Sequence, residues 1–164
     1  MPSTPRPCSI RYWRWGLALV FATLLAQAWV IVSPVYPPLF DLPNHMARHY
    51  LEARALAGHA LPAGYSIDYR VLPNLGGDLV IPPLLLILDP LPAAKVFLIL
   101  SVWLCWLGPA LFVLRLGQYR LPALLAALLW LPFTFNYHFF WGFLNYYSGL
   151  GLSFLVLTLP IRRS

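Results

Sequence analysis

The sequence predicts an all-α protein, a multi-pass bundle of about four transmembrane helices with an external loop that carries one or two surface helices. Of its 164 residues, 60% are hydrophobic and 10% are charged, whereas soluble domains carry about 25% charged residues. Its apolar stretches are long and unbroken, as in 15–32 and 96–114. A membrane barrel would instead show stretches of about ten residues with alternating hydrophobicity. Since lipid offers the backbone no hydrogen-bond partner, these stretches predict helices.

The first predicted span covers residues 15–35 and follows a basic tail, residues 1–14. About 20 apolar residues are enough to cross the hydrocarbon core, so we interpret this span as an uncleaved signal anchor. The small residues on either side of Gln27 also fit a signal peptidase site, with cleavage after Ala28 as the alternative. Both alternatives place the next segment outside the cytoplasm.

Residues 36–92 form the predicted external loop, with a juxtamembrane helix at 43–57 and a short apolar element at 79–88. The short element would rise about 15 Å as a helix, half of the hydrocarbon thickness, so we do not expect it to span. The remaining predicted segments are a span at 93–114, a cytoplasmic loop at 115–120, spans at 121–137 and 139–160, and a cytoplasmic end at 161–164. The last two spans should be joined by an outer turn near Asn136.

Basic residues mark the topology rather than a nucleic-acid surface. The net charge is +6, but the arginines lie at the ends of apolar stretches, so we expect no nucleic acid partner. The predicted cytoplasmic segments hold seven basic residues: Arg6, Arg11, Arg14, Arg115, Arg120, Arg162 and Arg163. The outside segments hold four: Arg48, Arg54, Arg70 and Lys95. Cytoplasmic loops carry an excess of Lys and Arg. We therefore expect both termini in the cytoplasm and the chain in the lipid bilayer of a bacterial-type inner membrane.

The juxtamembrane helix carries the main candidate site. Asp41, His45, His49 and Glu52 stand at steps of four, four and three, and the last three share one helix face. Two histidines with carboxylates can hold a divalent metal ion or form an acid/base pair. The structural alternative is that Asp41 caps the helix, Glu52 pairs with Arg48 and the histidines lie at lipid headgroups.

Further polar residues of the external loop are candidate auxiliary or substrate-binding groups. Arg48 and Arg54 can meet a phosphate, because the guanidinium fork matches phosphate oxygens. Bilayer headgroups offer the same phosphates. Arg70 and Asp78 flank a Gly-Gly turn that should lie at the outer surface near the short apolar element.

In its order of elements the segment 15–114 resembles the start of GT-C-type glycosyltransferases: one span, an acidic residue at the head of a surface helix, a second loop element and another span. Those multi-pass enzymes transfer a sugar from a polyprenyl-phosphate carrier on the outer face of a membrane. The resemblance implies a hexosyl- or pentosyltransferase in which Asp41 is catalytic, as a base or metal contact. Many members carry Asp-Glu where this chain has Asp41-Leu42. It also implies that the chain is an N-terminal portion or a shortened relative.

The competing hypothesis is a non-enzymatic membrane protein, either an assembly partner or a transporter subunit. A transporter should carry ionisable groups within its spans. The predicted spans contain none of the four charged residue types except Lys95 near an end, which disfavours transport. Asn145 in the last span needs a hydrogen-bonding partner. Gly149 and Gly151 should let the same helix pack closely on a neighbour.

Overall fold

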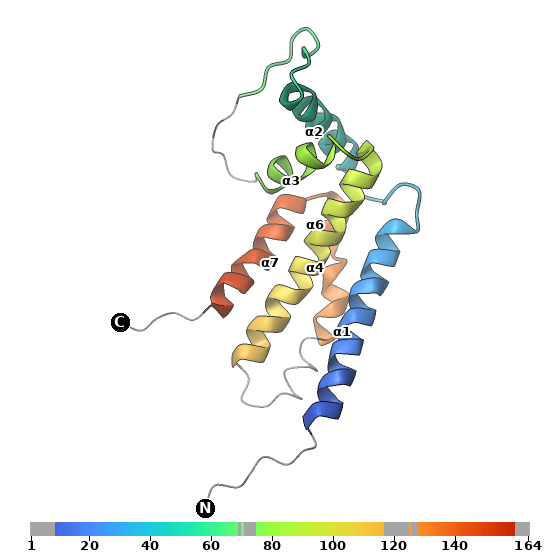
Figure 1. Cartoon of the computed structure of the whole chain (residues 1–164), viewed down its shortest axis with the longest axis vertical. Coiled ribbons are helices and arrows are strands. Elements are labelled where there is room, and N and C mark those ends of the chain that lie inside the picture. Colours follow the sequence, from blue (N-terminus) through green and yellow to red (C-terminus); the bar gives the residue numbers. More distant parts are fainter. Residues whose placement is uncertain (1–8, 69, 71–74, 117–124, 126–127, 160–164) are drawn as a thin grey trace, which may run out of the picture.

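The computed structural model describes residues 9–68, 70, 75–116, 125 and 128–159. The regular structure of these residues is helical, which confirms the predicted all-α class. The elements are α1 (Ser9–Val32), α2 (Leu42–Leu56), α3 (Gly76–Leu84), α4 (Pro90–Leu116), the 3-10 turn η1 (Leu131–Thr134), α6 (Tyr137–Trp141) and α7 (Leu144–Thr158). Helices α1, α4 and α7 run along the long axis, and α2 and α3 lie at one end (Figure 1). The predicted cytoplasmic ends and most of the loop 115–120 lie outside the described residues.

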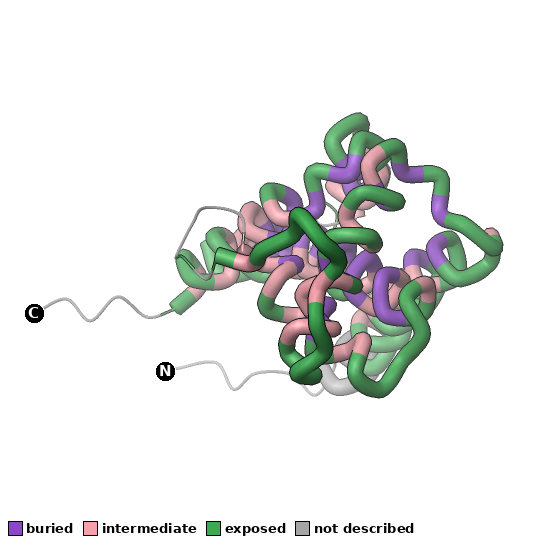
Figure 2. The backbone as a smooth tube through the Cα atoms, turned by 90° about the horizontal axis from the view of Figure 1, so that it is seen from above, coloured by how far each residue is buried: buried purple, intermediate pink, exposed green. Residues whose placement is uncertain are grey.

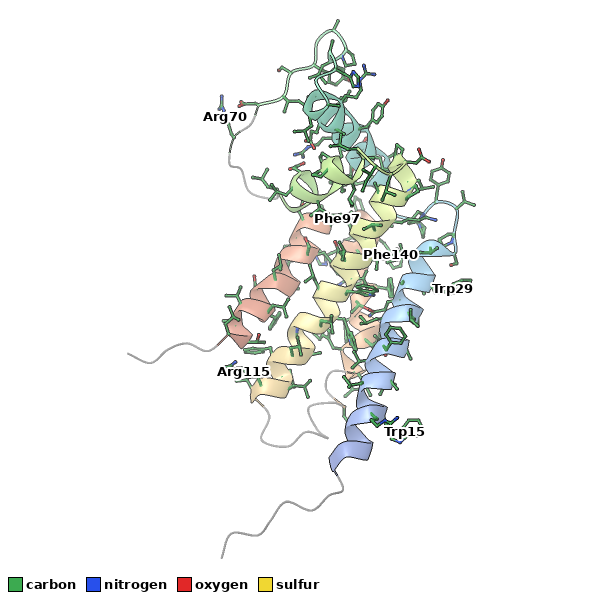
Figure 3. The ribbon with its side chains drawn as sticks, viewed as in Figure 1. Trp15, Trp29, Arg70, Phe97, Arg115 and Phe140 are labelled. Atoms are coloured by element: carbon green, nitrogen blue, oxygen red, sulfur yellow. The ribbon has the colours of Figure 1, made fainter. Side chains whose placement is uncertain are left out.

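Two of the described helices are long and apolar enough to cross a membrane. They are the 19 residues Arg14–Val32 of α1 and the 27 residues of α4. Only 17% of the apolar window in α1 is buried within the chain, against 50% in α4. Trp15 and Trp29 project from the outer side of α1 (Figure 3). Viewed along the long axis, the buried segments gather toward the middle of the molecule (Figure 2).

Helices α4 and α7 pack at backbone contact distance through a pair of glycines. A Cβ atom placed on Gly151 would lie 2.4 Å from the carbonyl oxygen of Leu104, and one on Gly108 would lie 2.3 Å from the carbonyl oxygen of Gly151. Gly149, two residues earlier, has no neighbour within 4 Å of such a Cβ. Small residues at helix interfaces allow this approach. The predicted close packing of the last helix is therefore confirmed for Gly151 and wrong for Gly149.

Residues 121–124, 126, 127 and 160 of the predicted spans 121–137 and 139–160 lie outside the described residues. The described part of these spans is not two continuous helices. Pro132 lies in η1, and Asn136 begins α6 by accepting a hydrogen bond from the Phe139 amide at 3.1 Å. Gly142, with φ of 89°, ends α6 in a conformation that favours glycine. The segment therefore has breaks at both Asn136 and Gly142, where the sequence predicted one. The last helix, α7, is 15 residues long.

Two short helices form a head at one end of the long helices. Helix α2 agrees with the predicted 43–57 to within one residue at each end. Helix α3 starts three residues before the predicted 79–88, and turns continue from its end to Leu88. The buried face of α2 presents Leu42, His49 and Ala53. Helix α2 packs on α3 and α4. This packing places His49, the polar residue of the buried face, against the first turn of α3.

Candidate functional site

A histidine and two carboxylates meet where α2 packs on α3. His49 and Glu52 come from α2, and Asp78 comes from the first turn of α3. The His49 Nδ1 atom lies 2.8 Å from Glu52 Oε2 and 3.4 Å from Asp78 Oδ1. One ligand atom from each residue lies within 4.8 Å of the others. Residues of these types at this separation, the His49–Glu52–Asp78 cluster, could hold a divalent cation.

Arg48 supplies the positive charge of this cluster in the structure. Its Nη2 atom lies 2.7 Å from Asp78 Oδ1, and its Nε atom lies 3.0 Å from Glu52 Oε1. The predicted pairing of Arg48 with Glu52 is therefore confirmed. The Arg48 side chain is also 54% exposed, so it covers the cluster from the solvent side. A cation bound by the cluster would have to share the two carboxylates with Arg48.

The Asp78 carboxylate is poorly compensated. Both of its oxygen atoms are buried and accept no well-formed hydrogen bond from the described residues, so the contact with Arg48 is an ion pair. Burial raises the pKa of Asp78 above its ordinary value of 3.8, and the nearby Glu52 raises it further. Arg48 and His49 oppose this rise. A carboxylate in this state gains from any further cation that reaches it.

The neighbours of His49 indicate which of its ring nitrogens carries the proton. Nδ1 faces a carboxylate oxygen of Glu52 at 2.8 Å, and because such an oxygen accepts hydrogen bonds, this nitrogen is assigned as the N–H donor. The Nε2 edge faces Gly77, where an added Cβ would lie 3.0 Å from Nε2. Gly77 is therefore needed for the approach of α3 to the imidazole. A metal ion bound between Nδ1 and the carboxylates would replace the Nδ1 proton.

The predicted metal group of Asp41, His45, His49 and Glu52 does not form in the structure. The His45 ring stacks on the His49 ring with centroids 6.0 Å apart, but its Nε2 lies 3.1 Å from the Gly142 carbonyl oxygen and 3.4 Å from Asp41 Oδ2. Asp41 and His45 therefore form a second pair, turned toward the α6–α7 corner. The spacing along α2 did not predict this arrangement, because the partner Gly142 at the end of α6 is distant in the sequence.

Asp41 occupies the N-cap position of α2 as predicted, but without the capping hydrogen bond. Its side chain makes no capping hydrogen bond to the backbone of α2; Asp41 Oδ1 instead accepts from Asn44 Nδ2 at 2.7 Å. Gly142 packs beside it, with an added Cβ at 3.0 Å from Asp41 Cβ. Because the Asp41 side chain is 40% exposed, its carboxylate can receive a proton from an approaching group.

Two side chains that the sequence placed in the candidate site lie apart from the cluster. Arg54 donates from Nη2 to the Ala60 carbonyl at 3.3 Å, which fastens the end of α2 to the following loop. Arg70 pairs with Asp68 at 2.7 Å on an exposed loop (Figure 3). Neither residue contacts His49 or Asp78 among the described contacts.

Helix α7 positions the head through Asn145. Its Oδ1 atom accepts a hydrogen bond from the Gly77 amide at 2.5 Å, beside the cluster. The sequence predicted that Asn145 would need a partner, and this is confirmed. The partner itself was not predicted, because nothing in an apolar stretch indicates which distant backbone amide its polar residue will meet.

Comparison with known proteins gives no family assignment. No protein-family model, curated protein or solved structure matches the chain. The function must therefore be inferred from the two apolar helices and from the polar groups held by α2 and α3.

The raised pKa of Asp78 predicts a specific pH dependence of stability. The folded protein keeps the Asp78 proton to higher pH than the unfolded chain does, so raising the pH from 3.8 through the folded-state pKa removes stability. Asp78→Asn lacks this titration. The melting temperature of the original protein in detergent should therefore fall relative to that of Asp78→Asn as the pH rises through this window. A relative gain would contradict the assignment.

Proposed function

We propose that the chain is a multi-pass membrane protein whose head, formed by α2 and α3, takes part in sugar transfer from a polyprenyl-phosphate carrier, as in GT-C-type glycosyltransferases. The observation that carries this proposal is the His49–Glu52–Asp78 cluster at one end of two membrane-length helices. A phosphate-linked donor needs positive charge at its phosphate, and a hydroxyl acceptor needs a base. The head offers both kinds of group, Arg48 on α2 and Asp41 at the N-cap of α2.

The proposed reaction gives Asp41 the role of base. The acceptor oxygen attacks the anomeric carbon of the sugar, its proton moves to the Asp41 carboxylate, and the bond from the sugar to the carrier phosphate breaks with its electron pair on the phosphate. His45 lies 3.4 Å from Asp41 and holds the carboxylate in place. Arg48 is close enough to the surface to meet the departing phosphate.

A divalent cation fits the residues present, because Asp78 is undercompensated and the donor set is one imidazole and two carboxylates. When bound, such an ion would stabilise the negative charge on the phosphate. His49, Glu52 and Asp78 would hold it, in place of the predicted group of four. Asp41 and His45 remain free for proton transfer.

The test is sugar transfer by the Asp41→Asn variant in membranes containing the complete polypeptide. The expected result is a loss of transfer of at least about 100-fold, the lower end of what general base catalysis contributes. The amount of protein in the membrane should stay unchanged, because the Asp41 side chain makes no capping hydrogen bond. Asp68→Asn is the matched control, since Asp68 is an exposed, ion-paired carboxylate on the same side of the chain. Full transfer by Asp41→Asn would remove Asp41 from the mechanism.

Four spans with both termini in the cytoplasm are the proposed topology. It predicts that α2 lies outside and that the Arg115 end of α4, at the opposite end of the long axis, lies inside (Figure 3). Single cysteines at Ala60 and at Leu116 test this in a background without Cys8 and Cys105. An impermeant thiol reagent should label intact cells at Ala60 only. Labelling at Leu116 without lysis would contradict the topology.

A second candidate function is supported by Arg48, which already bridges both carboxylates. In this alternative the cluster is only an ionic link that joins α2 to α3, and the head is an interface for an assembly partner. Besides sugar transfer, the two candidates differ in the binding of a divalent cation, which the ionic link does not require.

A further inference from the structure

A groove of about 280 Å³ lies beside the head end of α1, apart from the polar cluster. It is bounded by the last turns of α1 at Val30, by the segment that follows at Pro34 and Leu39, and by Phe139 and Phe140 of α6. Figure 3 shows Phe140 near the upper end of α1. All lining residues except Ser33 are apolar. The groove therefore suits an apolar group, and it lies where α1 ends.

Lys95 places a positive charge at this groove. Its ammonium nitrogen donates to the carbonyl oxygens of Val32 at 3.0 Å and of Pro34 at 2.7 Å, and Pro34 is a groove residue. An ammonium group has three donors, so one N–H is left. No carboxylate among the described residues forms an ion pair with Lys95. The apolar groove thus adjoins a cation that has no carboxylate partner among the described residues.

We propose that this groove and Lys95 bind one anionic phospholipid, with an acyl chain in the groove and the phosphate beside the ammonium group. The inference rests on the proposed membrane insertion but not on sugar transfer. Charge complementarity selects the occupant, because a soluble apolar ligand would bring no anion to the ammonium group and a zwitterionic headgroup would bring a second cation to it. The groove and Lys95 lie at a suitable depth, because the end of a membrane-spanning helix lies at the level of the lipid headgroups.

The experiment measures how strongly spin-labelled phosphatidylglycerol associates with the protein in phosphatidylcholine bilayers, compared with spin-labelled phosphatidylcholine. The original protein should prefer phosphatidylglycerol by about fivefold, the factor for one basic residue near an anionic surface. Lys95→Gln should lose the preference, and Lys95→Arg should keep it. Arg115→Gln is the matched control, because Arg115 also lies on α4 and donates to a backbone carbonyl, that of Thr158.

The groove itself is tested by filling it. Val30→Trp places a large ring in the groove and should abolish the preference, whereas Leu25→Trp on the same helix should not. The two positions are equally exposed, at 52% and 53%. Equal helicity by circular dichroism ensures that each variant is folded. The proposal is overturned if Lys95→Gln or Val30→Trp keeps the preference, if a control loses it as well, or if the original protein shows none. Sugar transfer is measured separately, so the lipid-binding result can be interpreted even if the protein transfers no sugar.

Discussion

Replacing Gly151 by leucine is expected to destabilise the protein by about 3 kcal/mol or more, the upper range for overpacking a tight interface. A Cβ at this position would lie 2.4 Å from the Leu104 carbonyl oxygen and 2.7 Å from the Cys105 amide nitrogen. Those atoms belong to the backbone of α4, so no side-chain rotation can make room. The contact between α4 and α7 would have to separate, and Asn145 would move away from α3 with it.

Gly149→Leu is the matched control for this prediction. It lies in the same helix and has no atom within 4 Å of an added Cβ. Its change should stay within about 1 kcal/mol, since leucine also favours helix over glycine by that order. The measurement is the thermal unfolding of both variants in the same detergent. Equal melting temperatures would show that α4 and α7 are not in backbone contact.

Asp78→Asn is expected to weaken the binding of Mn²⁺ to the head by at least about 100-fold. Loss of a residue that only supports a ligand costs 10–100-fold, and Asp78 is a direct ligand in the proposed site. Arg48→Gln should act in the opposite direction and tighten binding by roughly tenfold, because it removes a positive charge next to the site. Isothermal titration of the purified protein with Mn²⁺ measures both changes, with Asp68→Asn as the control.

The ionic-link alternative predicts a different pattern. If Arg48 is the only cation that the cluster accommodates, the original protein will show no saturable Mn²⁺ binding, and both Asp78→Asn and Arg48→Gln will only lower stability. Saturable binding that Asp78→Asn leaves unchanged would place the ion elsewhere. Either of these results would remove the cation from the proposed mechanism.

Local sequence signals predicted the helices well and the breaks less well. Helix α2 was predicted to within one residue because its strong helix formers are bounded by Asp41 and Gly58, and α4 because its apolar stretch is long. The segment from Leu131 to Gly142 was predicted less accurately. Apolar composition there favours a continuous span, whereas Pro132, Asn136 and Gly142 divide it, and composition alone does not show which of these residues ends a helix.

The candidate site was predicted in part. The spacing on α2 correctly joined His49 to Glu52, since residues three apart share a helix face. It also joined them to Asp41 and His45, whose side chains instead meet each other and Gly142. Asp78 was predicted as an auxiliary residue, but its place in the cluster depends on the packing of α3 against α2. The sequence pattern of a single helix cannot predict a contact between two helices.

The donor preference of the complete polypeptide tests the proposed function most directly. Membranes containing it are supplied with a polyprenyl-phosphate sugar or with the corresponding nucleotide sugar, and transfer to an acceptor hydroxyl is measured. We expect transfer from the polyprenyl-phosphate donor alone, and we expect this transfer to be lost in Asp41→Asn and lowered by a chelator of divalent cations. Transfer from the nucleotide sugar alone, or full transfer by Asp41→Asn, would contradict the proposed function.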